Sequence, residues 1–313
     1  MSQLNASSQR ETEQRRRPDR KLVFVVPSLV TTGNIFCGFY SVTESLAGAQ
    51  ALSLGNVVSA TEHFDRAAVN IGFSFLCDFL DGRIARMTGA TTEFGVELDS
   101  IADVLSFGIA PALLAFAWGY GTLPQFHKIA WAVSFVYLIC GALRLARFNV
   151  QARQPSPKLK PKHLKAEKKA FVGMPIPAGA VLVAAIAHFS PTPLLEGFHF
   201  EFLSRQASIP GEIVAVALLI LVACLGLLMV STIRYSSLSG LGYGKYHPRV
   251  LILGITFLVL SIWFYSRWSL LILATTFVSH GVILKIWGMS KSRKHGASDQ
   301  AKLELDNEPS RST

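Results

Sequence analysis

Long apolar runs separated by short polar segments are the main pattern of this chain. Eight runs approach the length of about 20 residues that an α-helix needs to cross a bilayer. They cover residues 22–46, 66–86, 96–119, 126–148, 174–194, 212–233, 249–266 and 269–288. Apolar residues in the core of a soluble protein are not distributed in this way. The pattern therefore predicts an all-α fold, a polytopic membrane helix bundle with about eight transmembrane helices.

Composition and charge agree with a membrane protein. Half of the residues are apolar, 16% are charged, and the mean hydropathy is +0.39. Basic residues gather in the N-terminal tail, in the 149–172 loop, around Arg234 and Lys245, and in the C-terminal tail. By the positive-inside rule both termini are then cytoplasmic, as an even number of spans requires. The net charge of +10 is interpreted as a topology signal of a multi-pass protein of the cell (inner) membrane, not as nucleic-acid binding.

The two ends are predicted to be disordered cytoplasmic tails. Residues 1–21 are polar and basic, and residues 290–313 are polar and poor in aromatics. The first apolar run is long and has no small-residue cleavage site before a soluble domain, so the N-terminus is not interpreted as a signal peptide.

Four aspartates within apolar sequence are the strongest chemical signal. Asp78 and Asp81 are three residues apart near the end of the second run, and Asp99 and Asp103 are four apart at the start of the third. Each pair shares one helix face, and the turn at 87–95 lets the two faces meet. Carboxylates at membrane depth are costly and usually functional. Four of them carry a charge of about −4, which two divalent cations, Mg²⁺ or Mn²⁺, would cancel.

Arg86 extends the metal prediction to a substrate. A guanidinium beside a metal cluster can bind phosphate through two donors. Gly82 and Gly95 carry no side chains and allow close approach of a helix or a ligand. Two metals and an arginine suit a diphosphate whose P–O bond is to be broken. The site is expected near the cytoplasmic face.

The same residues resemble a known signature, that of the CDP-alcohol phosphatidyltransferases. Every position is filled in Asp78-x2-Asp81-Gly82-x2-Ala85-Arg86-x8-Gly95-x3-Asp99-x3-Asp103. The resemblance implies that a hydroxyl attacks the lipid-side phosphate of a CDP-linked lipid and that CMP leaves. It implies that Asp78, Asp81 and Asp99 ligate metal, and that Asp103 ligates the second metal and acts as general base. The implied CDP-binding residues are Gly82, Ala85, Arg86 and Gly95.

Segments outside the signature resemble the bacterial members of the family that use serine. They are residues 27–38, 99–111, 141–149 and 171–177. The implied substrates are CDP-diacylglycerol and L-serine, and the implied assembly is a homodimer. The predicted organisation is a catalytic core at 22–233 with the six helices typical of the family, followed by two additional transmembrane helices at 234–289.

Serine has a carboxylate that must be held. Arg144 and Arg147 are three residues apart at the cytoplasmic end of the fourth run, and we expect one or both to clamp this carboxylate. Asn149 lies nearby as a polar orienting group. The alternative is that these arginines only follow the positive-inside rule, which places basic residues at cytoplasmic helix ends without any serine site. Asn34 is expected at the CDP site, and a helix–helix hydrogen bond is its alternative.

Other functions stay open at this point. Within the family, glycerol 3-phosphate or choline could replace serine as the acceptor. An ion-coupled transporter would explain the spans and the acids, but not the Asp-Gly-x2-Ala-Arg pattern. A structural or assembly factor leaves the four acids unexplained. His188 and His280 are isolated in the sequence and are interpreted as packing or interface residues.

Overall fold

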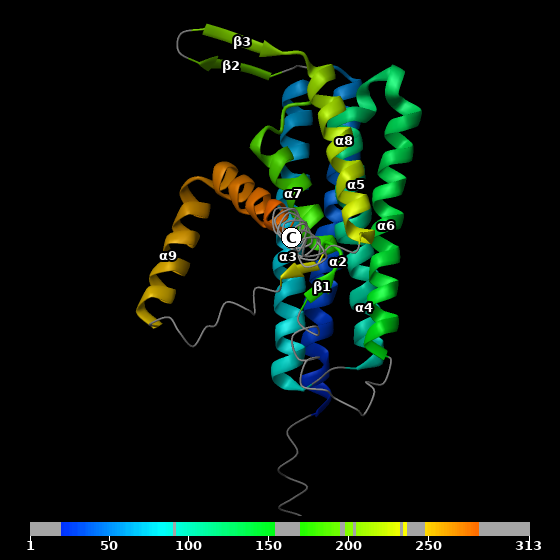
Figure 1. Cartoon of the computed structure of the whole chain (residues 1–313), viewed down its shortest axis with the longest axis vertical. Coiled ribbons are helices and arrows are strands. Elements are labelled where there is room, and N and C mark those ends of the chain that lie inside the picture. The colour runs from blue at the N-terminus through cyan, green and yellow to red at the C-terminus, as the bar shows by residue number, and fades with distance from the viewer. Residues whose placement is uncertain are drawn as a thin grey trace, which may run out of the picture.

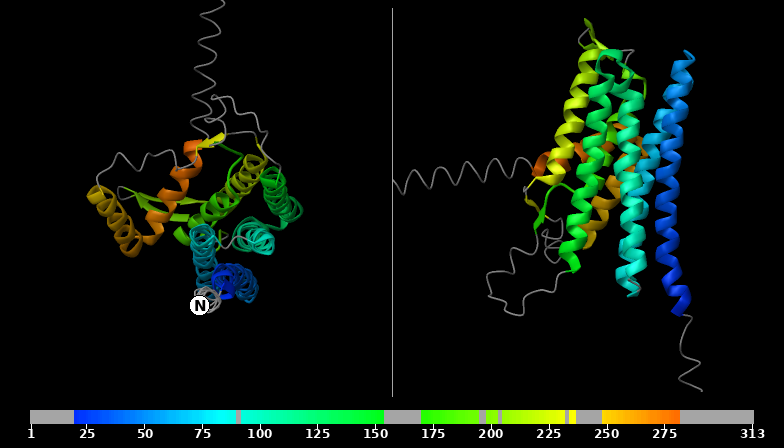
Figure 2. Two further views of the ribbon diagram at one scale, coloured as in Figure 1. Left: turned by 90° about the horizontal axis from the view of Figure 1, so that it is seen from below. Right: turned by 90° about the vertical axis from the view of Figure 1, so that its right-hand side faces the viewer.

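A computed structural model shows an elongated bundle of near-parallel helices (Figures 1 and 2). It describes residues 20–89, 92–153, 170–194, 198–202, 205–231, 234–236 and 248–281. Most of the predicted tails and of the 149–172 loop lie outside these residues. Each of the eight apolar runs falls on a helical segment, so the helical class is confirmed.

The first half of the chain forms four long helical stretches. Helices α2 and α3 make a hairpin, and α4 continues through two π-helical segments before a short connection leads into α6. The elements are α2 (Arg20–Ser53), α3 (Val57–Thr88), α4 (Glu93–Asp103), η1 (Val104–Ile109), α5 (Ala110–Leu114), η2 (Ala115–Gly119), η3 (Tyr120–Thr122), η4 (Pro124–Phe126) and α6 (His127–Arg153).

The second half adds helices and two short antiparallel strand pairs, which the apolar pattern did not predict. Strand β1 pairs with β4, and β2 pairs with β3 in a hairpin that projects from one end of the bundle (Figure 1). The elements are β1 (Ala170–Val172), α7 (Ile176–Phe189), β2 (Phe198–Phe202), β3 (Arg205–Ile209), α8 (Gly211–Val230), β4 (Arg234–Ser236), α9 (Pro248–Phe264) and a helix at 266–281.

Local caps position the turn between α3 and α4. Helix α3 ends at Gly89, whose φ of +64° is a conformation that glycine adopts without steric cost. Thr92 caps the start of helix α4: its Oγ1 accepts a hydrogen bond from the Gly95 N–H at 3.0 Å. The chain therefore reverses direction within a few residues, and both α3 and α4 pack against α2.

The π-helical segment η1 packs closely against α2. A Cβ added to Gly38 would lie 2.9 Å from the Ser106 Cα, so only glycine fits there. Pro111 has no N–H for the Phe107 carbonyl, which instead accepts a hydrogen bond from the Tyr137 hydroxyl at 3.2 Å. A proline that removes the helical N–H donor of a carbonyl is a physical reason for irregular helix at this place, shortly after Asp103.

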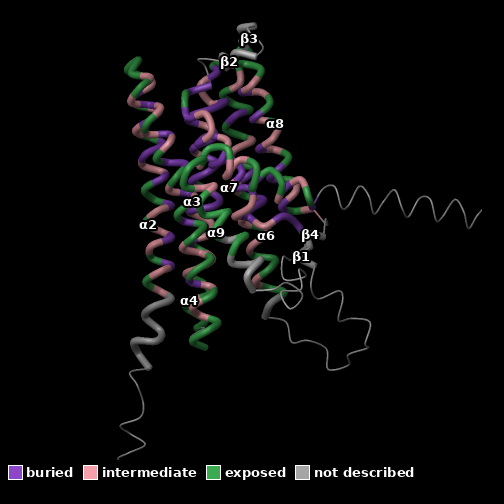
Figure 3. The backbone as a smooth tube through the Cα atoms, turned by 90° about the vertical axis from the view of Figure 1, so that its left-hand side faces the viewer, coloured by how far each residue is buried: buried purple, intermediate pink, exposed green. Residues whose placement is uncertain are grey.

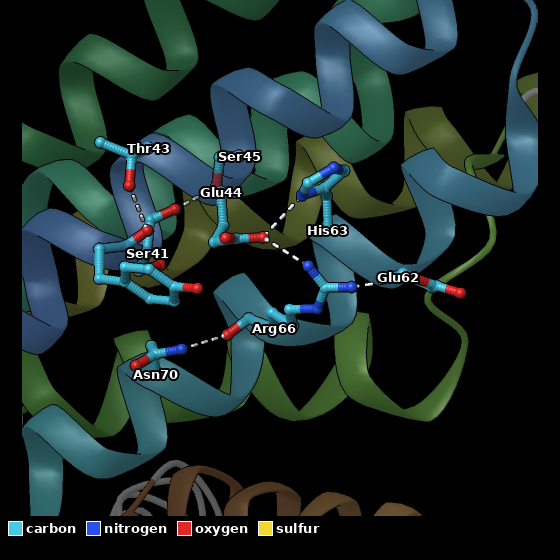
Figure 4. Close-up of polar contacts among 9 residues, drawn as sticks. Ser41, Thr43, Glu44, Ser45, Glu62, His63, Arg66 and Asn70 are labelled. Atoms are coloured by element: carbon cyan, nitrogen blue, oxygen red, sulfur yellow. Dashed lines mark hydrogen bonds and ion pairs between the residues drawn. The ribbon is translucent and has the colours of Figure 1, made fainter.

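A polar cluster joins α2 to α3 in the half of the hairpin nearer its turn (Figure 4). Glu44 Oε2 lies 2.7 Å from His63 Nδ1 and 3.7 Å from Arg66 Nη1, and Arg66 Nη2 lies 2.9 Å from Glu62 Oε2. Ser41 Oγ donates to the Ala67 carbonyl at 2.8 Å. The buried carboxylate of Glu44 is thus paired, whereas the side chains of Arg66 and Glu62 are largely exposed.

Three of the described helical stretches are long and apolar enough to cross a membrane: Glu93–Thr122, Pro124–Gln151 and Gly211–Val230. Helix α7 is apolar but shorter. Buried residues gather in the interior of the bundle, whereas the first turns of α4 are largely exposed (Figure 3). The chain is therefore an integral membrane protein, while eight spans and a six-helix core stay predictions.

Candidate active site

Three of the four aspartates meet between α3 and α4. One carboxylate oxygen from each of Asp78, Asp99 and Asp103 lies within 4.8 Å of the others. Asp78 comes from α3, and the other two come from successive turns of α4. Three carboxylate oxygens this close repel one another unless a cation lies between them. The cluster therefore has the geometry of a divalent-cation site.

Asp81 lies beside this group but is not one of the three. Its side chain is on the next turn of α3 and is 3% exposed. Asp81 lies within electrostatic reach of both Asp78 and Asp99. The fourth acid therefore adds to the charge of the cluster, and it also lines the cavity described below.

Unpaired polar atoms gather at the same place. Among the described residues, the buried side-chain nitrogens and oxygens without a hydrogen-bond partner belong to Asn34, Asp81, Asp99, Asp103 and Arg144. A buried polar group without a partner costs about 1–3 kcal/mol, and more when it is charged. All five are residues that the sequence assigned to the site. Buried carboxylate oxygens without hydrogen-bond donors fit divalent cations, which bind to oxygen.

A cavity of about 230 Å³ opens next to the cluster, between the ends of α2, α3 and α4. It is lined by four of the five residues predicted for the CDP site, all except Asn34. The lining residues are Ser28, Thr31, Asp81, Gly82, Ala85, Arg86, Thr92, Gly95, Val96 and Asp99. Ser28, Thr31, Thr92 and Val96 were not predicted as site residues, and only the capping position of Thr92, just before an acidic first turn, could have indicated it.

Arg86 supplies positive charge to this cavity. It lies in the last turn of α3 and within electrostatic reach of Asp78. A Cβ added to Gly82 would meet only Arg86 Nη2, at 3.8 Å, so the space over this turn is open. The cavity thus offers a guanidinium and a side-chain-free surface beside a carboxylate cluster, which is the arrangement expected for a phosphate-bearing ligand.

Asn34 lies apart from the cavity. Its backbone carbonyl accepts hydrogen bonds from Ser106 Oγ at 3.1 Å and Ser74 Oγ at 3.3 Å. These serines precede Asp78 and follow Asp103 by about one helical turn, so Asn34 lies deeper in the bundle than the acids. Its contact with CDP stays a prediction, and the structure shows that its main chain joins three helices.

The three residues expected to hold serine are not brought together. Arg144 is partly buried and lies within electrostatic reach of Asp103. Arg147 is exposed. Asn149 Nδ2 donates to Ser100 Oγ at 2.7 Å and lines a separate cavity of about 650 Å³ between α4 and α6. Arg144 and Asn149 are five residues apart, which separates their side-chain directions by about 140° around the helix axis. Asn149 therefore cannot lie on the same face of α6 as Arg144.

Comparison with known proteins agrees with this site. The family described as CDP-alcohol phosphatidyltransferase matches residues 24–203, more than half of the chain. A CDP-diacylglycerol–serine O-phosphatidyltransferase of Helicobacter pylori is 34% identical over 239 residues, covering 76% of this chain and 81% of the relative. The Bacillus subtilis protein of the same name is 36% identical over 172 residues, covering 54% and 78%. The chain belongs to the CDP-alcohol phosphatidyltransferase family.

Proposed function

We propose that this protein transfers the phosphatidyl group of CDP-diacylglycerol to the hydroxyl of L-serine, giving phosphatidylserine and CMP. Family membership supports the reaction type, and the names of several relatives support the two substrates. The observation that carries the proposal is the cluster of Asp78, Asp99 and Asp103 beside a cavity that contains Arg86. A transporter would not need this phosphate-binding cavity next to the acids.

The four aspartates are proposed to hold two divalent cations, Mg²⁺ or Mn²⁺. When bound, such cations polarise phosphoryl oxygens and offset the charge on the departing CMP. The fit rests on buried carboxylate oxygens of Asp99 and Asp103 that have no hydrogen-bond donor among the described residues. The absence of sulfur and imidazole from the group favours a hard cation.

The CDP moiety is proposed to lie in the cavity along α3 and α4. Arg86 would donate to the diphosphate, and the bare backbone at Gly82 and Gly95 would let it approach both helices. Apolar helices on both sides of the cavity keep the lipid portion in the membrane. This arrangement suits a substrate with a soluble headgroup and two acyl chains.

Asp103 is proposed to act as the general base. It would accept the proton of the serine hydroxyl as that oxygen attacks the lipid-side phosphate and the P–O bond to CMP breaks. Arg144 lies within electrostatic reach of Asp103 and has a buried Nε without a partner. It would bind the serine carboxylate and so bring the hydroxyl to Asp103.

One assay separates the acceptors. Purified protein in detergent is incubated with CDP-diacylglycerol, Mn²⁺ or Mg²⁺, and a panel of alcohols, and CMP release is measured. Release with L-serine alone supports the proposal. Release with glycerol 3-phosphate or choline would assign another acceptor within the same family. No release under any condition would contradict the proposed transferase activity. A cytoplasmic active site and a homodimer remain part of the same proposal.

A further inference from the structure

A second group of chemically complementary side chains lies far from the aspartates. His188 Nδ1 is 2.6 Å from Asp65 Oδ1, and His188 Nε2 is 3.0 Å from Ser266 Oγ. Asp65 belongs to α3, His188 to the last turn of α7, and Ser266 to the first turn of the helix at 266–281. Asp65 and Asp78 are thirteen residues apart on α3, about 20 Å at 1.5 Å per residue. This group is therefore not part of the proposed transferase site.

The two contacts of the imidazole determine its hydrogen-bonding roles. A carboxylate can only accept, so His188 Nδ1 carries the proton and donates it to Asp65. His188 Nε2 is then the acceptor and takes the hydroxyl hydrogen of Ser266. Hydroxyl to imidazole to carboxylate, in this order, is the arrangement that activates a serine as a nucleophile.

Exposure allows a reaction at this serine. The side chain of His188 is 11% exposed and that of Asp65 is 32% exposed. The two side chains are therefore mostly buried but remain accessible to solvent. Ser266 is partly buried. The first intrahelical bond runs from the Ser269 N–H to the Tyr265 carbonyl at 3.0 Å, so the N–H groups before it have no partner within this helix. Such groups are suited to stabilise an oxyanion.

Aromatic residues around the connection favour an apolar ligand. Trp263, Tyr265 and Trp268 are 81%, 68% and 58% exposed, and the Trp268 ring also contacts Phe189 edge-on at 4.7 Å between centroids. Exposed aromatic side chains of this kind occupy the interface between lipid and water. An ester with an apolar acyl chain would reach Ser266 from this surface.

We propose that Asp65, His188 and Ser266 form a serine-hydrolase site that cleaves carboxylic esters with apolar acyl chains. Ser266 Oγ attacks the ester carbonyl carbon as its proton passes to His188 Nε2. The bond to the alcohol breaks, and the alcohol leaves with that proton. Water then cleaves the acyl-serine by the same path, giving a carboxylic acid and the free enzyme. Asp65 orients the imidazole throughout.

The test uses the full-length protein, purified in detergent and treated with a fluorophosphonate probe. Peptide mass mapping of the wild type should find the adduct on Ser266. Hydrolysis of p-nitrophenyl esters of octanoate and acetate should favour octanoate, and should fall about a hundredfold or more in Ser266→Ala. His188→Gln should also lose the adduct. Ser269→Ala, on the same helix, should keep both the adduct and the rate.

The alternative is that the three side chains only tie the helix at 266–281 to α3 and α7. In that case the wild type carries no adduct on Ser266, all variants hydrolyse the esters at one rate, and the unfolding temperature falls in Ser266→Ala. That result would overturn the proposal. Because mapping is done on the wild type, a variant that fails to fold cannot obscure the outcome. Serine-dependent CMP release should be unchanged in Ser266→Ala.

Discussion

At the scale of single residues, Asp103 combines the two roles on which the proposed chemistry depends. It supplies a carboxylate oxygen to the three-aspartate cluster, and it lies within electrostatic reach of Arg144. No other aspartate of the cluster has an arginine from α6 as a neighbour among the described contacts. Asp103 therefore lies between the other proposed cation ligands and the Arg144 side chain. This is a suitable place for a base that accepts the proton of the serine hydroxyl.

Asp103→Asn should lower the rate of CMP release by about 10²–10⁴-fold, the usual contribution of a general base, and by more if a cation is lost. The amide keeps the shape of the side chain but cannot take a proton at neutral pH. Steady-state CMP release with L-serine measures the effect. Glu93→Gln, an exposed acid on the same helix, is the matched control and should keep full activity. Equal rates for both variants would contradict the role of Asp103.

Arg144→Lys should raise the KM for serine by about tenfold or more and leave the KM for CDP-diacylglycerol almost unchanged. Lysine keeps the charge but cannot bind a carboxylate through two parallel donors. Arg147→Lys provides the comparison, because Arg147 is exposed and should tolerate the change. If the two variants have the same serine KM as the wild type, the carboxylate is bound elsewhere.

At the scale of elements, the spacing of residues on one helix was predictable and contacts between distant helices were not. Three or four residues between acids determine a shared face, so the meeting of Asp78 with Asp99 and Asp103 followed from spacing and a short turn. Asn149 was grouped with Arg144 by nearness in sequence, although their helical angle separates them. The hydrogen bond between Asp65 and His188 joins residues 123 positions apart. No pattern within a short stretch of sequence could have predicted this contact.

The contact between α2 and η1 yields a prediction with a natural control. Gly38→Ala should destabilise the protein by about 1–3 kcal/mol, because the new Cβ would overlap Ser106 and push apart the helices that carry the acids. Gly72→Ala on α3 should not, since nothing lies within 4 Å of its added Cβ. Thermal unfolding in detergent and CMP release measure both variants. A Gly38→Ala protein as stable as Gly72→Ala would contradict close packing at η1.

Tyr137→Phe tests the explanation offered for the irregular helix after Asp103. The variant leaves the Phe107 carbonyl without its hydroxyl donor, and Pro111 cannot replace it. A loss of about 1–3 kcal/mol is expected for an unpaired buried carbonyl. Unfolding by heat or denaturant reports the loss, with Tyr265→Phe at an exposed position as control. If the two changes cost the same, the hydroxyl does not support this turn.

At the scale of the whole molecule, the transferase residues and the C-terminal helices are spatially separate. Helix α9 lies off one side of the bundle, away from the ends of α3 and α4 that carry the aspartates (Figures 1 and 2). The helix at 266–281 contacts the bundle through Ser266 and the Trp268 ring. The sequence predicted a catalytic core at 22–233 followed by two additional helices. Because these helices lie apart from the aspartates, they can be removed to test whether the core acts alone.

A chain truncated after Ser236 keeps the pairing of β4 with β1 and removes α9 and the helix that follows. It should release CMP with serine at a rate within about threefold of the full chain, because no residue of the aspartate site is lost. Its unfolding temperature should be lower, since His188 loses its hydrogen bond to Ser266 and Phe189 loses its ring contact with Trp268. Size-exclusion chromatography in detergent establishes that the shortened protein is folded. If the shortened protein is folded but releases no CMP, the C-terminal helices belong to the catalytic unit. The loss of activity could not then be explained by a loss of folding.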